Sequence, residues 1–212
     1  MNQYSEKTKT AKPAWTLRRP RTRKAQATRQ RQLDAAEALF GEKGYYETSI
    51  ADITRRADVA LGTFYVYFPS KLAIFRELVE HLNRRLRQEL RNATRGLTNR
   101  AAAERVGLEA FFRFVKQHRN LYRIVQQAEL VDQKLYRWYY REFAKGYRRE
   151  LMRAMKSGEL QKMDAESLAY CLMGVAHFLG MRWVLWDGKG VSDRQFDSAM
   201  KFIYHGILSR KA

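Results

Sequence analysis

The stretch Arg31–Leu82 decides the fold: RQLDAAEALFGEKGYYETSIADITRRADVALGTFYVYFPSKLAIFRELVEHL. Leu33, Leu39 and Phe40 belong to an apolar pattern at helical spacing, so the stretch opens with an amphipathic helix. Gly44 suits the end of that helix, because glycine adopts a positive φ at little cost. The pattern therefore predicts a first helix that stops at Gly44.

A second and a third helix are expected across a tight turn. Ser49 offers a hydroxyl cap and Asp52 follows three residues later, which is the spacing of a reciprocal helix cap. Residues 57–59 are expected to turn, and residues 60–67 to form a short helix that Pro69 stops. Two helices joined in this way are typical of a helix-turn-helix, which places its second helix in the major groove of DNA.

The third helix divides into two faces. Phe64 and Phe68 are expected to point inward, and the outward side chains are Leu61, Thr63, Tyr65 and Tyr67. Two tyrosines and a threonine suit contacts with a DNA groove better than they suit a solvated surface.

The same stretch resembles the TetR family of bacterial transcriptional regulators, whose head ends in the pattern G-T-[LF]-Y-x-x-F-x-[ST]-K. Residues 62–71 read GTFYVYFPSK, and residues 36–59 match the upstream elements A-x-x-L-F-x-x-x-G-Y, T-[ST]-[IV] and I-A-x-x-A-x-V. Two positions depart from the pattern. Thr54 replaces the usual alanine, and Leu61 stands where many members carry a lysine or arginine.

The resemblance implies that the head contacts operator DNA. At positions matching the family pattern, Thr63, Tyr65 and Tyr67 are expected at the major groove and its phosphates. Thr48 and Lys71 are expected to hold phosphates. The full set of expected DNA contacts is Thr48, Ser49, Leu61, Thr63, Tyr65, Tyr67, Lys71, Arg21 and Arg23.

The net charge of +19 is distributed unevenly. Residues 1–31 carry ten Lys or Arg and one acidic residue, whereas residues 32–80 carry five and eight. A basic arm that includes Arg21 and Arg23 can condense onto phosphates or enter a minor groove. The alternative is a solvated tail that aids solubility.

Length and composition favour an all-α chain with two domains. We expect a flexible basic arm over residues 1–24, a helix-turn-helix domain over residues 25–71, and a ligand-binding and dimerisation domain over residues 72–212. No eighteen consecutive residues are apolar, so no membrane span is expected. Cys171 lies in an apolar run and is expected to be a buried thiol. A single cysteine fits a reducing compartment, so we expect the protein in the bacterial cytoplasm, associated with the nucleoid when it is bound to DNA.

An enzyme is not expected. The four histidines are scattered, and the sequence has no H-E-x-x-H motif, Gly-rich phosphate loop or nucleophile elbow. Neither catalytic residues nor a metal site nor a resident cofactor follows from the sequence.

The body is expected to contain six helices, of which the first links it to the head. Their expected ranges are 71–95, 101–117, 121–129, 132–157, 164–187 and 193–209.

The last two helices carry apolar residues around most of their circumference. Such helices must be covered from more than one side. The resemblance implies the same, because TetR-like regulators dimerise through their last two long helices and bind a near-palindromic operator as a two-fold dimer. The expected interface residues are Leu172, Val175, Leu179, Trp183, Phe196, Met200, Ile203 and Tyr204.

Aromatic residues are concentrated over residues 111–147. Any one of them can be core, but Tyr and Trp carry polar tips that suit a ligand cavity. Beside them a basic stripe of Arg137, Arg141, Lys145 and Arg148 or Arg149 is either a solvated face or a seat for an anionic head group. The expected ligand contacts are Phe111, Tyr122, Trp138, Tyr139, Phe143, Arg137, Arg141 and His177.

Residues 121–147 and 172–186 also resemble the body of TetR-type repressors of fatty-acid or phenylacetate breakdown. Their inducers are acyl-coenzyme A thioesters, so the resemblance implies a repressor released by an acyl- or aryl-coenzyme A. Another aromatic or hydrophobic inducer, a ligand-free architectural dimer and an activator remain open. A solvent-excluded cavity in the body would favour a ligand over the architectural dimer.

Overall fold

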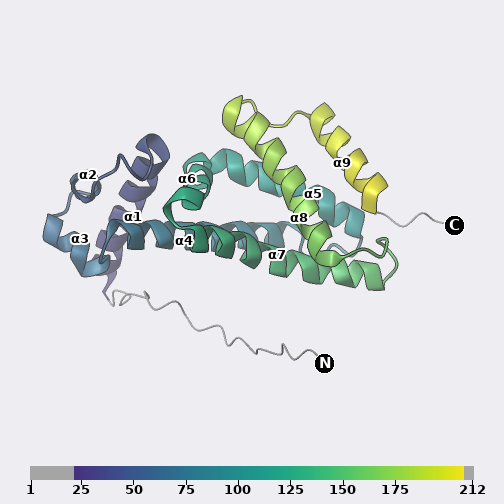
Figure 1. The fold of residues 1–212 in the computed structure, drawn as a ribbon, viewed down its shortest axis with the longest axis horizontal. Coiled ribbons are helices and arrows are strands. Elements are labelled where there is room, and N and C mark those ends of the chain that lie inside the picture. The colour runs from purple at the N-terminus through teal and green to yellow at the C-terminus, as the bar shows by residue number, and fades with distance from the viewer. Residues whose placement is uncertain (1–21, 208–212) are drawn as a thin grey trace.

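The computed structural model describes residues 22–207, and over that range its regular elements are all helices, which confirms the all-α fold class. Figure 1 shows a small helical head at one end, from which a long helix runs into a larger body. The elements are α1 (Arg23–Lys43), α2 (Ile50–Arg56), α3 (Leu61–Tyr67), α4 (Lys71–Ala93), α5 (Arg100–Gln117), α6 (Arg119–Val131), α7 (Gln133–Lys156), α8 (Ala165–Leu179), η1 (Gly180–Trp186) and α9 (Asp193–Ile207).

The helix ends of the head follow the local signals in the sequence. Gly44 ends α1 with φ +89°. Ser49 caps α2 in the reciprocal arrangement with Asp52, and Asp58 makes the turn before α3 with φ +52°. Ser70 accepts a hydrogen bond from the backbone N–H of Ala73 at the start of α4. Because α1 already begins at Arg23, residues 23–24 belong to the head and not to the arm.

One aromatic core joins the head to α4. Phe40, Phe64, Phe68 and Phe75 are each fully buried, and the rings of Phe40 and Phe75 lie 5.5 Å apart in an edge-to-face arrangement. Because Phe75 belongs to α4, the first turns of that helix are part of the head's own core, and their orientation is fixed by it.

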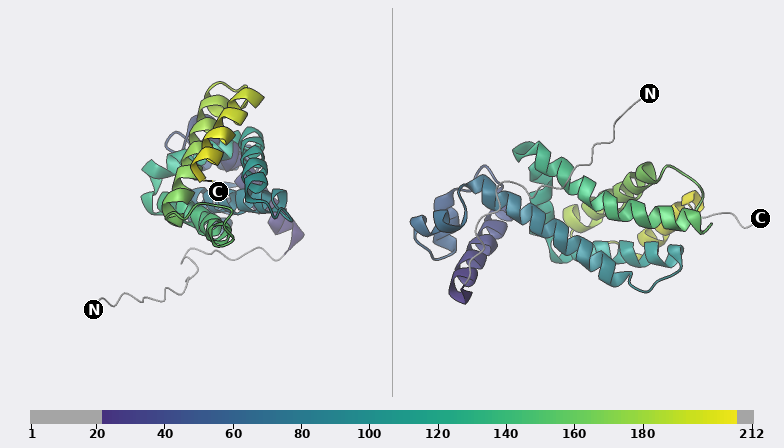
Figure 2. Two further views of the ribbon diagram at one scale, coloured as in Figure 1. Left: turned by 90° about the vertical axis from the view of Figure 1, so that its right-hand side faces the viewer. Right: turned by 90° about the horizontal axis from the view of Figure 1, so that it is seen from below.

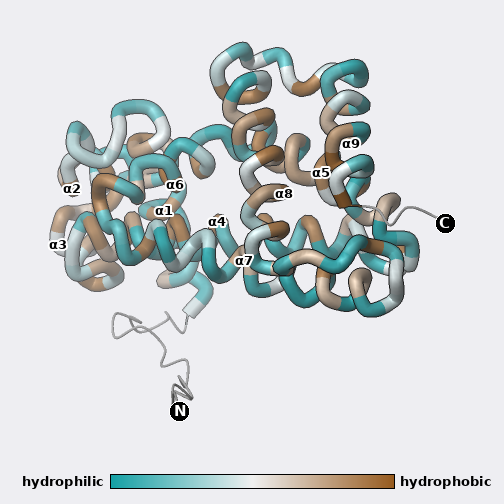
Figure 3. The backbone as a smooth tube through the Cα atoms, turned by 45° about the vertical axis from the view of Figure 1, so that its right-hand side comes forward, coloured by the Kyte–Doolittle hydropathy of each residue, from teal (hydrophilic) through white to brown (hydrophobic). Residues whose placement is uncertain are grey.

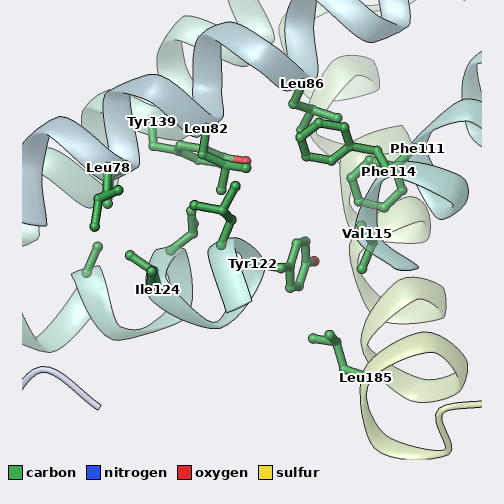
Figure 4. Packing of buried hydrophobic residues seen from close by; sticks show 14 of the residues in the cluster. Leu78, Leu82, Leu86, Phe111, Phe114, Val115, Tyr122, Ile124, Tyr139 and Leu185 are labelled. Atoms are coloured by element: carbon green, nitrogen blue, oxygen red, sulfur yellow. The ribbon is translucent and has the colours of Figure 1, made fainter. Parts of the chain in front are cut away.

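In the body, α4 and α7 lie side by side and run in the same direction (Figure 2). Arg76 of α4 pairs with Asp132 at 2.6 Å, and the amide of Asn83 donates to the backbone carbonyl of Tyr139 at 3.0 Å. Figure 4 shows Leu78, Leu82 and Leu86 along α4 and Tyr122 of α6 directed into the space between the helices. Because the two helices are parallel, the N-terminal ends of both lie near the head and their C-terminal ends lie at the far end of the body.

The helix after α7 differs from expectation at its end. It continues beyond Leu179 as the π-helical segment η1, where the hydrogen-bond register widens. The widening occurs at Gly180, which lies so close to α5 that an added Cβ would be 3.3 Å from the ring of Phe111. Cys171 of α8 is exposed, so the expectation of a buried thiol was wrong: its flanking apolar residues are not all turned inward.

The continuous helix Ala165–Trp186 is long and apolar enough to cross a membrane by length and composition, although only 33% of its most apolar window is buried. The sequence prediction missed it because scattered small and polar residues interrupt the apolar run. The core helix of a soluble protein can pass the same test. Figure 3 shows apolar residues along α8, which lies beside α9, and two large apolar side chains of this helix, Phe178 and Trp186, are 64% and 65% exposed.

Candidate nucleic-acid interface and body cavity

The outer face of α3 is apolar and exposed. Leu61, Tyr65 and Val66 are 53%, 54% and 71% exposed, whereas Thr63 and Tyr67 are half-buried. Val66 was missed from the sequence, although it is one helical turn beyond the exposed Gly62 and belongs to the same face. Such a face on a short helix at the end of the molecule is shaped for contact with another surface.

Two residues expected to hold phosphates have structural roles in the head. Thr48 is fully buried, and its hydroxyl donates to the carbonyl of Gly44 at 2.8 Å. The ammonium of Lys71 donates to the carbonyls of Tyr45 and Thr48 at 2.9 and 2.8 Å. It also lies 4.4 Å from the centre of the Tyr45 ring, and desolvation lowers the pKa of Lys71. These contacts fasten the loop between α1 and α2 onto α4.

Of the other expected DNA contacts, Ser49 is exposed at the start of α2, and Arg23 is exposed in the first turn of α1. Arg21 lies outside the described residues, as does the rest of the basic arm over residues 1–20. Arg55 is an exposed cation of α2 that the sequence prediction omitted; it pairs with Asp52 on its own helix.

The body encloses a cavity of about 540 Å³ between α4, α5, α6, α7 and α8. Five of the eight expected ligand contacts line it: Phe111, Tyr122, Tyr139, Phe143 and His177. Its size is within the range of small-molecule sites, and its walls are largely aromatic and aliphatic with a few polar groups.

The other three expected ligand contacts lie elsewhere on α7. Arg137 and Arg141 are exposed, and Trp138 is half-buried against the core; none of them lines the cavity. The face of α7 that does line it contains Tyr139, Tyr140, Phe143, Gly146, Tyr147 and Glu150, at helical spacing. Of the expected basic stripe, Arg149 lines the cavity, whereas Arg137, Arg141, Lys145 and Arg148 do not. The aromatic pattern therefore located the cavity better than the basic pattern did.

Further arginines join Arg149 of α7 at the end of the cavity far from the head. Arg87 and Arg91 lie near the end of α4, and Arg95 follows in the turn after it, at the same spacing of four residues. The Nε atom of Arg87 is buried and has no hydrogen-bond acceptor among the described residues. The spacing of these arginines is visible in the sequence, but only the packing of α4 against α7 shows that they share one cavity.

One arginine at this end is neutralised within the protein. Arg100 donates from Nε to Glu104 at 2.8 Å, and the Tyr147 hydroxyl donates to the same carboxylate. Burial raises the pKa of Tyr147, so its hydroxyl remains a donor. The charge available to a bound anion therefore comes mainly from Arg91, Arg95 and Arg149, because Arg100 is paired with Glu104 and Arg87 lies 4.0 Å from the carboxylate of Glu142.

The end of the cavity nearest the head is polar in another way. Nδ1 of His177 on α8 and the hydroxyl of Tyr122 on α6 share a hydrogen bond. Gln126 follows Tyr122 by one helical turn, and its amide donates to the sulfur of Met181 at 3.4 Å. Burial raises the pKa of Tyr122 and lowers the pKa of His177, so both groups are neutral near pH 7.

A second hollow lies between α8 and α9 on the outside of the body. Gly174, Val175, Leu179 and Trp183 line it, together with Phe178 and Phe202, which are 64% and 70% exposed. We refer to this surface, with Trp186, as the α8–α9 face; the side chain of Trp186 is 65% exposed. Ser192, Arg194, Gln195 and Ser198 line the polar side of the hollow, and a Cβ added at Gly174 would meet nothing within 4 Å.

The expected interface residues divide between this face and the core. Val175, Leu179 and Trp183 line the hollow, whereas Leu172 lines the main cavity. Phe196, Met200 and Ile203 are buried inside the chain, and the Tyr204 hydroxyl donates to the carbonyl of Ala101 at 3.0 Å. This placement revises the expected contact set, because one face of α9 covers its own chain and the other face carries Phe202.

Helix α6 joins the cavity to the head. Its Tyr122 and Gln126 line the cavity, while the amide of Gln127 donates to the carbonyl of Phe40 at 2.9 Å and accepts from the N–H of Tyr45 at 2.7 Å. Gly41 allows this contact to be close, since an added Cβ would be 2.4 Å from the side chain of Asn120. The two faces of one short helix therefore touch both candidate sites.

Comparison with known proteins supports both parts of this description. Residues 33–78, which span α2, α3 and the flanking parts of α1 and α4, match the family described as bacterial regulatory proteins, tetR family. A fatty acid metabolism regulator protein of Bacillus subtilis is 26% identical over 190 residues, which cover 84% of this chain and 94% of the relative.

Solved structures show that the fold extends through the body. The fatty acid degradation regulator FadR from Bacillus halodurans superposes with a TM-score of 0.73 at 21% identity, covering 86% of this chain and 97% of that one. FadR from Bacillus subtilis in complex with stearoyl-CoA superposes with a TM-score of 0.72, also at 21% identity, covering 84% and 98%.

These matches account for the capped helix-turn-helix, the exposed face of α3 and the helical body behind it. Residues 33–78 are a DNA-binding head of the tetR family of bacterial regulatory proteins, and the chain is a transcriptional regulator of this type.

Proposed function

We propose that this regulator is a homodimeric repressor that leaves a palindromic operator when an acyl- or aryl-coenzyme A thioester enters the body cavity. The observation that carries this proposal is the polarity of that cavity: its interior is aromatic, and arginines line the end far from the head. A thioester of this class has the same polarity, since an apolar acyl group is joined to a head that bears several negative charges.

The arginines favour an anionic head group over a neutral ligand. Arg91, Arg95 and Arg149 are exposed, so they can accompany a phosphate-rich group that remains partly in solvent. The buried Nε of Arg87 offers one more donor further in. A buried donor without an acceptor is costly, and a bound anion removes that cost.

The interior favours an apolar tail. Leu86, Leu108, Phe111 and Phe143 contribute aliphatic and aromatic surface, and a cavity of about 540 Å³ suits the tail better than the whole thioester. The B. subtilis FadR structure contains stearoyl-CoA, and it shares the fold of this chain. That likeness supports the ligand class here, although the sequences differ enough for the tails to differ.

The dimer is proposed from the α8–α9 face. A second copy of the chain is the natural cover for Phe178, Phe202 and Trp186, because a contiguous exposed apolar surface of this kind marks an interaction site. Two α8–α9 pairs related by a two-fold axis form a four-helix bundle. Each α3 helix of the dimer then binds one half-site of a palindromic operator.

We propose that α4 and α6 together transmit the effect of ligand binding from the cavity to the head. The sequence suggested α4 alone, which begins with Lys71 in the head and reaches Arg87 and Arg91 at the cavity. The structure supplies α6 as a second link through Gln127. A ligand that shifts either helix changes the spacing of the two heads, and a rigid duplex follows such a change only at a cost in energy.

The test is operator release by a panel of thioesters. Duplexes selected by the purified protein from a random pool serve as the operator, and fluorescence anisotropy follows their release. We expect dodecanoyl-, palmitoyl- or phenylacetyl-coenzyme A to release the duplex, whereas coenzyme A and the free acids do not at equal concentration. Release by a free acid alone, or by none of the thioesters, would contradict the ligand class.

Repression is tested on the same operator by run-off transcription. We expect the protein to lower transcript yield from a promoter that overlaps the operator, and the active thioester to restore it. An increase in transcript on adding the protein would identify an activator instead.

A further inference from the structure

The end of the cavity nearest the head has hydrogen-bonding groups that an unsubstituted acyl chain cannot satisfy. His177 lines this end, and its Nδ1 is occupied by the Tyr122 hydroxyl. The Tyr122 hydroxyl has no other hydrogen-bond partner among the described residues, so we assign it as the donor, and the neutral imidazole then carries its hydrogen on Nε2. That N–H donates to none of the described residues.

Gln126 supplies the complementary group. It lies one turn after Tyr122 on α6, so the two side chains are neighbours on the same helix face. Its amide nitrogen donates to a thioether, which is a weak acceptor, and its carbonyl oxygen accepts from none of the described residues. The end of the cavity therefore presents one N–H donor and one C=O acceptor.

A hydroxyl group matches this pair, because it donates one hydrogen bond and accepts another. A carbonyl group can use only the His177 donor, and a methyl group can use neither. Aromatic rings surround the pair: the Tyr122 and His177 ring centres are 5.6 Å apart, and those of Tyr140 and His177 are 6.4 Å apart. In such surroundings an unsatisfied polar group is costly, so the site discriminates against a plain chain.

The hydroxyl and the anionic group must be well separated in the ligand. Tyr140 marks the inner end of the cavity on α7 and Arg149 marks the outer end. Nine residues of helix separate them, which corresponds to about 13 Å at the rise of an α-helix. The ligand is therefore long, with its hydroxyl near the end opposite the anionic group.

We propose that the effector is a thioester whose acyl group carries a hydroxyl at or near its far end, bound between the Nε2–H of His177 and the amide oxygen of Gln126. This inference rests on the proposed function and narrows its ligand class from acyl or aryl thioesters in general to hydroxylated ones. No bond is made or broken, so the hydroxyl acts in recognition alone.

Calorimetric titration of the purified full chain tests the proposal with two probes, dodecanoyl-coenzyme A and its ω-hydroxy analogue. We expect the hydroxylated probe to bind the unmodified protein about tenfold more tightly, the equivalent of one satisfied buried donor. His177→Phe keeps a ring of similar size without the N–H, and Gln126→Met keeps a chain of similar length without the amide. Each variant should lose the preference while still binding dodecanoyl-coenzyme A.

His81→Phe is the matched control, because His81 is exposed on α4 and does not line the cavity. It should retain the preference. The two variants are on different helices, so a folding defect in one leaves the other to decide.

Equal binding of the two probes by the unmodified protein would contradict the proposed recognition of a hydroxyl group, while the proposal of a thioester ligand would be unaffected. Retention of the preference in both variants would overturn the assignment to His177 and Gln126. Binding of neither probe would overturn the thioester class and this inference with it.

Discussion

The head and the body differ in how completely they are packed. In the head, four phenylalanines fill a small core, and caps at Ser49 and Ser70 fix the helix ends. The body leaves a cavity of about 540 Å³ inside and an apolar face outside. The core of the head is thus filled by its own side chains, whereas the proposed ligand would fill the cavity of the body and the proposed second copy would cover its apolar face.

The difference in packing between head and body indicates which part a ligand can enter. A fully packed head has no room for a ligand, so it can only be moved as a unit by α4 and α6. A body with an unfilled interior has alternative packings that a ligand can select.

The largest effect is expected at the α8–α9 face. Phe178→Asp combined with Phe202→Asp places charges on the two most exposed phenylalanines of that face. Sedimentation velocity should show a monomer, and affinity for a two-half-site duplex should fall at least about a hundredfold, because the second head is no longer held at high effective concentration. Met152→Asp, at an exposed position on α7, should leave the dimer intact. A dimeric double variant would assign the face to another partner.

The next effect concerns the reading face of α3. Tyr65→Ala removes an exposed ring, so the thermal midpoint should stay constant while operator affinity falls about tenfold to a hundredfold. Tyr65→Phe separates the ring from the hydroxyl. An unchanged gel-shift titration for the alanine variant would exclude Tyr65 from the DNA contact.

A smaller effect is expected at the arginines of the cavity. Arg91→Ala with Arg95→Ala should weaken calorimetric binding of the releasing thioester about tenfold. Arg137→Ala with Arg141→Ala is a closely matched control, since both pairs are exposed, are four residues apart in the sequence and remove the same charge. Equal losses in the two double variants would show a general charge effect and no seat in the cavity.

The smallest effect on DNA binding is expected at Lys71. Because its ammonium bonds two backbone carbonyls, Lys71→Met should lower the free energy of unfolding by about 1–2 kcal/mol. The slope of log affinity against log salt should stay constant. Arg23→Met, at the exposed start of α1, should make that slope shallower by about one unit. A shallower slope in the Lys71 variant would restore its role as a phosphate ligand.

The sequence predicted the head better than the body for a physical reason. Gly44, Ser49, Asp52 and Ser70 act on backbone groups within a few residues, so their effect is readable from spacing alone. Thr48 and Lys71 show that a family position does not fix the partner of a side chain. Each matches the family pattern, but each donates to a backbone carbonyl that only the folded loop brings near.

In the body, periodicity identified the helices but not which of their faces meet. Arg137 and Arg91 belong to equally regular stripes, and only the packing of α4 against α7 decides that Arg91 faces the cavity. For the same reason Met200 looked like an interface residue and proved to be core.

The sequence by itself determined an all-helical chain, a capped helix-turn-helix head with a tyrosine on its reading helix, and a body rich in aromatic residues. These properties follow from local backbone chemistry and from the period of the apolar pattern. The tertiary structure alone decided that Tyr122, Gln126 and His177 meet at one end of a cavity and that α6 links this end to the head. Contacts between helices distant in sequence depend on their relative rotation and crossing, which no single helix encodes.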